Sequence, residues 1–115
     1  MTNLISKTND SVYNEFLSLI AKNYMKEHEL GFYAEQLGFS TRQLNNLTTK
    51  NANRTPKSLI DYYVIYESQQ LLAHTKLPVS EISERLGFKS QVTFCRLFKR
   101  VTGYTPTEYR HNKAL

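Results

Sequence analysis

Glycine and proline are scarce in this 115-residue sequence, at four and three residues, and tryptophan is absent. Turn-rich β-sandwiches and barrels need many such turn residues, so the scarcity argues against them and favours helices. The single cysteine, Cys95, has no partner for an internal disulfide bond. Apolar residues still make up 40% of the chain, which is enough for a core and argues against global disorder.

Long apolar runs are also missing. The first twenty residues include Asn3, Lys7, Asn9, Asp10 and Glu15, which do not suit a secretory leader. No stretch approaches the length of a membrane span. We therefore expect a cytoplasmic protein in a reducing compartment, with no membrane partner.

Acidic residues are absent from two segments, although the net charge is only +5. The first basic segment lies between Glu35 and Asp61 and carries four basic residues, and the second lies between Glu84 and Glu108 and carries five. The rest of the chain has ten acidic and six basic residues. Two positive segments in an acidic frame suit a polyanion that is contacted at two points.

The first half of the chain predicts three helices. Apolar residues three and four apart begin at Val12 and indicate an amphipathic helix that ends near His28, with Gly31 as a stop. A short helix is expected over residues 32–37, before the break at Gly38. Ser40 should then cap a third helix, with Gln43 completing a capping box. That helix should bury Leu44 and Leu47, and residues 51–54 should form a loop.

A long helix should follow. Thr55 can cap it and Pro56 is tolerated at its first position, and its apolar stripe runs to about His74. Pro78 prevents the helix from continuing.

The second half repeats the pattern. Ser80 is expected to cap a short helix with Ile82 and Leu86 facing inward, before a break at 87–88. A helix over residues 90–100 should bury Phe94, Leu97 and Phe98. Thr105 and Glu108 form a capping box that opens a last short helix.

The two halves are copies of one motif. Glu-Gln-Leu-Gly-Phe at 35–39 matches Glu-Arg-Leu-Gly-Phe at 84–88, at an offset of 49. Leu44, Leu47, Lys50 and Thr55 match Phe94, Leu97, Arg100 and Thr105 at an offset of 50, because the second turn has one more residue. Such an internal period reveals the architecture.

A short helix, a tight glycine turn and a second capped helix form a helix-turn-helix. The outer face of the second helix fits the major groove of DNA and needs side chains that form hydrogen bonds with base edges. Candidate base-contacting residues are Thr41, Arg42, Asn45 and Asn46 in the first motif, and Ser90, Gln91, Val92, Thr93 and Arg96 in the second. Candidate phosphate-contacting residues are Lys50, Arg54, Lys57, Lys89, Lys99 and Arg100.

The segment Gly-Phe-Lys-Ser-Gln-Val-Thr-Phe-Cys-Arg-Leu-Phe-Lys at 87–99, followed by Thr-Gly-Tyr-Thr-Pro-Thr-Glu-Tyr-Arg at 102–110, resembles the C-terminal signature of AraC/XylS-type transcription regulators. The resemblance covers about residues 12 to 112. It implies an all-α fold of about seven helices, in which a long central helix joins two helix-turn-helix subdomains. It also implies base contacts from the starts of both recognition helices, at the residues given above.

We therefore expect a flexible tail or linker remnant at 1–11, a first subdomain at 12–55, a connecting helix at 56–76 and a second subdomain at 77–112. The expected partner is double-stranded DNA, bound sequence-specifically at two major-groove segments about 34 Å apart. The resemblance adds RNA polymerase and an N-terminal sensing or dimerising domain as further partners. The chain is either a stand-alone regulator or a fragment of a longer one, and its polar first ten residues favour a fragment.

The first motif departs from the family pattern at three positions. Thr48 replaces an aromatic residue, Asn46 replaces a frequent arginine, and Asn53 replaces a loop glycine that the second motif keeps as Gly103. Asparagine tolerates the left-handed backbone that such a glycine adopts, so the fold should survive.

Two alternatives stay open: a helical protein-interaction module that uses the acidic frame, and a non-catalytic DNA-guiding domain of a larger protein. Enzyme chemistry finds little support. Glu81 and Glu84 lie three apart as catalytic carboxylates can, but a solvated helix face explains them better. The three histidines lack the spacing of metal ligands, so we expect no catalytic residue, metal or cofactor.

Overall fold

The computed structural model describes residues 9–114, and the side chains of residues 11–112. These residues form seven α-helices and no strand. The helices are α1 (Asn9–Asn23), α2 (Leu30–Leu37), α3 (Thr41–Ala52), α4 (Pro56–His74), α5 (Val79–Arg85), α6 (Gln91–Thr102) and α7 (Pro106–Ala114). Among the helices described, none is both long and apolar enough to cross a bilayer. The expected all-α fold of seven helices is confirmed.

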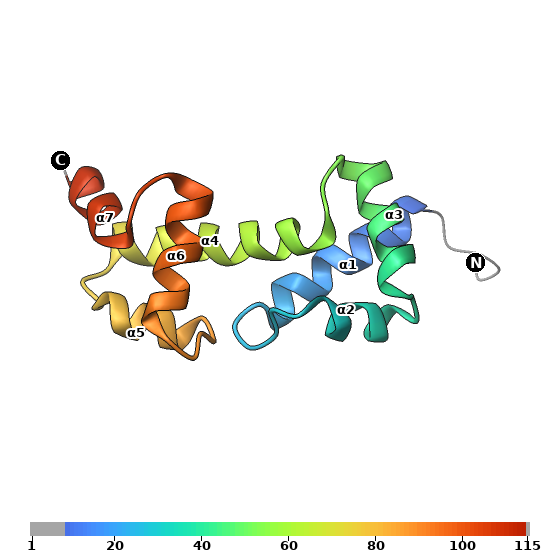
Figure 1. Cartoon of the computed structure of the whole chain (residues 1–115), viewed down its shortest axis with the longest axis horizontal. Helices are drawn as coiled ribbons and strands as arrows, with labels where there is room; N and C mark the ends of the chain where they lie inside the picture. The colour runs from blue at the N-terminus through green and yellow to red at the C-terminus, as the bar shows by residue number, and fades with distance from the viewer. Residues whose placement is uncertain (1–8, 115) are drawn as a thin grey trace.

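The molecule is elongated, with principal extents of 51 × 27 × 24 Å, and α4 runs along its middle (Figure 1). One end of α4 packs against α1 and α3, and the other end packs against α5, α6 and α7. The apolar side chains form two clusters, one centred on Phe16, Tyr33 and Leu44, the other on Ile82, Phe94 and Phe98. Each helix-turn-helix unit therefore has its own core, and α4 contributes to both.

Three of the predicted caps are present. Ser40 Oγ accepts from the backbone N–H of Gln43 at 3.1 Å, and the Gln43 side chain accepts from the Ser40 N–H at 2.8 Å. Thr55 Oγ1 accepts from the Ser58 N–H at 3.2 Å, with Pro56 in the first turn of α4. Thr105 and Glu108 form the expected reciprocal pair. The cap on α6 is Ser90, which accepts from the Thr93 N–H at 3.1 Å.

The predicted cap at Ser80 is wrong. Helix α5 begins at Val79 with Pro78 at the N-cap, and Ser80 lies exposed inside the first turn. The carbonyl of Pro78 accepts from the N–H groups of Glu81 and Ile82, both at 3.0 Å, so the helix starts before Ser80 can cap it.

The first helix is placed differently from the prediction at both ends. It begins at Asn9, three residues before Val12, and the rest of the predicted tail lies outside the described residues. It ends at Asn23 rather than near His28. His28 Nε2 donates a hydrogen bond to the Tyr24 carbonyl at 2.9 Å. In a continuing helix, that carbonyl would instead accept from the backbone N–H four residues later. Helix α2 then begins at Leu30 and includes Gly31, so that glycine is not a stop.

Helices α3 and α6 each end at a residue in the left-handed conformation. Helix α3 continues through Asn51 and Ala52, which were predicted to be loop, and it stops at Asn53 with φ of 55°. Helix α6 stops at Gly103 with φ of 88°. Asparagine and glycine both tolerate this conformation. The expectation that Asn53 adopts the left-handed backbone of the equivalent Gly103 is therefore confirmed.

Candidate nucleic-acid interface

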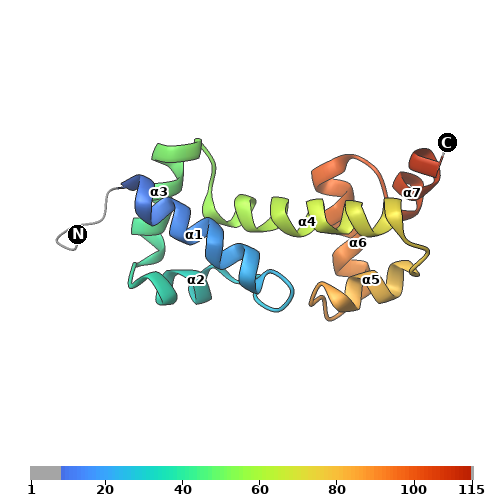
Figure 2. The same cartoon turned by 180° about the vertical axis from the view of Figure 1, so that it is seen from behind.

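The two candidate recognition helices, α3 and α6, lie on the same side of the molecule. In Figure 1 both lie nearer the viewer than α1 and α4, and from behind in Figure 2 α1 and α4 are in front. Both run from the lower edge of the view towards the upper edge. Their N-termini, where unpaired N–H groups carry partial positive charge, therefore point the same way.

One face of each recognition helix is buried and the other is free. Leu44 and Phe94 are fully buried at equivalent positions, as are Thr48 and Phe98. Thr48 donates from Oγ1 to the Asn45 carbonyl at 3.3 Å, so the threonine that replaces an aromatic residue has its hydroxyl satisfied in the core. The opposite faces carry the candidate base-contacting residues, and all nine of these residues are exposed.

Two hydroxyls at the start of α6 are already engaged. Ser90 Oγ accepts from the Thr93 N–H, and it lies 2.9 Å from Thr93 Oγ1. Ser90 in the second motif is thus the structural equivalent of Ser40 in the first. Gln91 forms a side-chain hydrogen bond with Cys95 one turn along the helix. Val92 and Arg96 are exposed on the same helix, and Val92 is 59% exposed.

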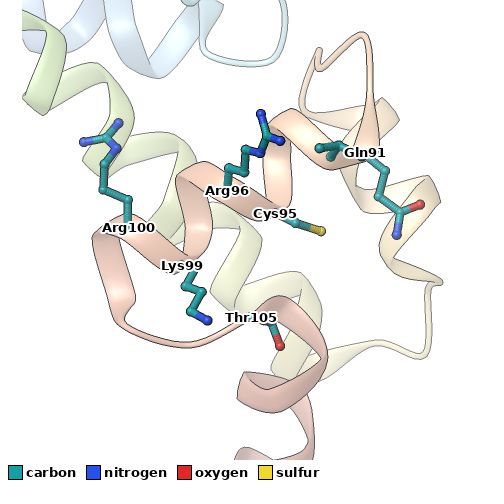
Figure 3. Close-up of a pocket in the computed structure, with 7 residues that line it drawn as sticks. Gln91, Cys95, Arg96, Lys99, Arg100 and Thr105 are labelled. Atoms are coloured by element: carbon teal, nitrogen blue, oxygen red, sulfur yellow. The ribbon is translucent and has the colours of Figure 1, made fainter.

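A hollow of about 550 Å³ runs beside α6 and the loop that leads to α7 (Figure 3). Arg96 and Arg100 extend to one side of the helix, and Lys99 extends towards Thr105 on the other. Cys95 lies between them, where burial raises the pKa of its thiol. A raised pKa keeps the thiol protonated and does not suit a nucleophile.

The predicted phosphate-contacting residues are all exposed, but three of them have partners. Asp61 of α4, whose side chain is only 9% exposed, binds Lys57 Nζ at 2.8 Å and an Arg100 side-chain nitrogen at 3.4 Å. The Arg54 guanidinium lies 5.6 Å from the centre of the Tyr62 ring, as in a cation–π contact. Lys50, Lys89 and Lys99 form no ion pair among the described residues that would hold them away from DNA.

Sequence patterns missed Lys26. It lies in the loop between α1 and α2 and lines a groove of about 710 Å³ between the two units, together with Lys57, Lys89, Arg96 and Arg100. Glu27 and Glu29 follow it in the sequence, so charge patterning gave no signal for it. The groove is lined by basic side chains from both units, and also by the carboxylates of Glu27, Glu29 and Asp61.

The carboxylates considered for catalysis are arranged differently from a catalytic pair. Glu81 Oε2 accepts from Arg85 at 2.9 Å in an i,i+4 ion pair on the surface of α5. That pairing is typical of a solvated helix face.

Comparison with known proteins agrees with this geometry. A helix-turn-helix domain family matches residues 33–112. The lactose operon transcription activator of Staphylococcus xylosus is 30% identical over 96 residues, which are 84% of this chain and 34% of that protein. The chain thus spans about a third of the length of that relative.

Solved structures share the fold. An AraC-type transcriptional regulator from Chromobacterium violaceum superposes with a TM-score of 0.80 at 25% identity, covering 91% of this chain and 94% of that one. The DNA-binding domain of AdpA, in complex with a target DNA, gives 0.75 at 21% identity, covering 93% of both chains. This chain therefore belongs to the AraC/XylS type of helix-turn-helix transcription regulators, and it is a sequence-specific DNA-binding domain.

Proposed function

We propose that α3 and α6 of this chain enter successive major-groove segments on one face of the same duplex, and that this binding regulates transcription. The observation that carries the proposal is the placement of two capped helices on one side of the molecule, with their N-termini aligned. Successive major-groove segments lie about 34 Å apart, and the 51 Å long axis can span them.

The exposed residues suit base reading. Arg42 and Arg96 can pair with guanine, and Asn45, Asn46 and Gln91 with adenine. Val92 can contact a thymine methyl group. Thr41, Thr93 and Ser90 add hydroxyls, although Ser90 and Thr93 share theirs within the cap.

The basic residues suit the phosphate backbone. We assign phosphate contacts to the six predicted residues, and we add Lys26 because of its place in the groove between the units. Such contacts give affinity and register, with little sequence information.

The greater length of the relatives supports a further proposal about partners. This chain spans only 34% of the lactose operon activator, so a sensing or dimerising domain and RNA polymerase are proposed partners of the whole regulator. Because the ligand is genomic DNA, we also propose that the protein acts in the cytoplasm and performs no chemistry of its own.

The test is selection of bound sites from a random DNA pool, followed by fluorescence-anisotropy titration of the selected duplex and a random duplex over a range of salt concentrations. We expect the selected duplex to bind about a thousandfold more tightly, and both affinities to fall steeply with salt. Absence of affinity for either duplex at low salt would contradict the proposal and favour a protein-interaction module.

A further inference from the structure

The loop at residues 24–29, between α1 and α2, reaches both helix-turn-helix units. Tyr24 packs against the apolar clusters of both. Its hydroxyl donates to Glu67 Oε1 of α4 at 3.2 Å, and its ring centre lies 5.0 Å from that of Tyr63. Burial, and then the Glu67 carboxylate, raise the pKa of Tyr24, so its hydroxyl remains a donor. The start of the loop is thus fixed to the central helix.

The rest of the loop is held by side chains that bind its backbone. The fully buried Tyr33 donates its hydroxyl to the Glu27 carbonyl at 2.7 Å. His28 donates from Nε2 to the Tyr24 carbonyl at 2.9 Å. Two of the loop's carbonyl groups are therefore satisfied within the first unit, which favours one loop conformation.

This ordered loop lies against the turn of the second unit. The His28 ring centre is 4.7 Å from that of Phe88, with the planes at 46°. Gly87 has φ of +86°, and a Cβ on it would overlap the Met25 carbonyl oxygen and lie 3.1 Å from the carbonyl carbon. Gly38, at the same place in the first motif, has nothing within 4 Å of such an atom. The two copies of the turn therefore differ, because only the second is closed by a neighbour.

We propose that the loop at residues 24–29 is a second connector beside α4, which fixes the spacing and relative orientation of the two recognition helices through Gly87, His28 and Phe88. The inference rests on the proposed function, in which both helices bind one DNA site. A single helix permits bending and twisting of the units about its axis, and a contact away from that axis opposes both motions. Two rigidly joined binding units gain affinity through their effective concentration, and loosening the joint reduces that gain.

The chain offers a matched pair of variants. Gly87→Ala forces an alanine into a left-handed conformation and against Met25. Gly103→Ala imposes the same conformational strain, at φ of +88°, with nothing within 4 Å of the new atom. His28→Ala removes the ring contact with Phe88 and introduces no backbone strain. Thermal unfolding followed by circular dichroism identifies which variants are folded, and His28→Ala is the test variant if Gly87→Ala unfolds.

The first measurement needs no DNA. Spin labels on two exposed positions, Lys99→Cys of α6 and Asn45→Cys of α3, in a Cys95→Ser background, give the distribution of distances between the two helices. We expect Gly87→Ala and His28→Ala to shift or broaden this distribution, and Gly103→Ala to keep that of the parent chain. Equal distributions in all of them would overturn the proposal.

The second measurement uses unlabelled protein, the selected duplex, its separate half-sites, and versions with one base pair inserted between the half-sites. We expect Gly87→Ala and His28→Ala to lose about tenfold in affinity for the intact site, to keep their half-site affinities, and to discriminate less against the insertion. Retention of the parent's spacing preference would contradict the connector. If the parent chain binds no duplex, the proposed function fails. The distance measurement still tests whether the loop at residues 24–29 fixes the two units relative to each other.

Discussion

Asp61 holds two of the cations that we propose for phosphate binding. Its carboxylate contacts Lys57 on its own helix and Arg100 on α6, and so joins the two units at the groove. A nearly buried carboxylate beside two exposed cations reduces the positive charge that the groove presents to a polyanion. Asp61 therefore limits the affinity of this surface for DNA of any sequence.

Asp61→Asn tests this effect. Affinity for a random duplex should rise, because Lys57 and Arg100 are released while the amide keeps nearly the same shape. The free energy of unfolding should fall by no more than about 1 kcal/mol, because both cations are largely solvated. Anisotropy titration and urea unfolding measure the two effects. Glu84→Gln, on the exposed surface of α5, is the control for net charge, and an equal rise in both variants would contradict a local role.

Arg96 and Lys99 distinguish base reading from phosphate binding. Arg96→Ala should weaken the selected site by about 1–3 kcal/mol and relax specificity at one base pair, because a bidentate contact with guanine is lost. Lys99→Ala should weaken all sequences similarly and flatten the salt dependence. Competition titration with single-base variants of the site measures both. An equal loss on selected and random DNA in Arg96→Ala would rule out its proposed role.

For individual residues, the sequence predicts which side chains are exposed, but it does not predict which ion pairs they form across the fold. The 3.6-residue period places Arg42 and Arg96 opposite Leu44 and Phe94, and all four have the expected exposure. The contact between Asp61 and Arg100 joins residues 39 positions apart. Only tertiary packing brings these two residues together, so the local sequence around either residue does not predict the pair.

The helix starts depend on short-range capping, and Ser40 is the clearest case. Ser40→Ala removes the acceptor for the Gln43 N–H, and should lower the free energy of unfolding by about 1 kcal/mol. Loss of this bond should also fray the first turn of α3, which is a candidate recognition helix. Urea unfolding and hydrogen exchange at residues 41–43 measure these effects. Ser80→Ala is the matched control, since Ser80 caps no helix, and an equal loss there would contradict the assignment.

Helix starts and ends differ in how well local sequence predicts them. The caps at Ser40, Thr55 and Thr105 were predictable, because each bond joins residues three apart. The end of α1 was not, because it depends on the His28 ring taking a backbone carbonyl in a loop that contacts the other unit. The prediction for Ser80 is wrong because α5 begins one residue earlier, with Pro78 at the N-cap and no side-chain cap.

For the whole molecule, the internal repeat predicts two similar units, and the stripe from Leu59 to Leu72 predicts the helix that joins them. These features also made the family resemblance informative. The sequence does not predict how the two units are rotated relative to each other. That rotation depends on the groove contacts of Asp61 and on the approach of Gly87 to Met25, which involve residues distant in the chain.

The central claim is that both recognition helices bind the same face of one duplex. Hydroxyl-radical footprinting of the chain on its selected site tests this directly. Binding of α3 and α6 to one face predicts two protected patches whose centres lie about ten base pairs apart on the same face of the DNA duplex. A single patch, or two patches on opposite faces, would contradict this claim.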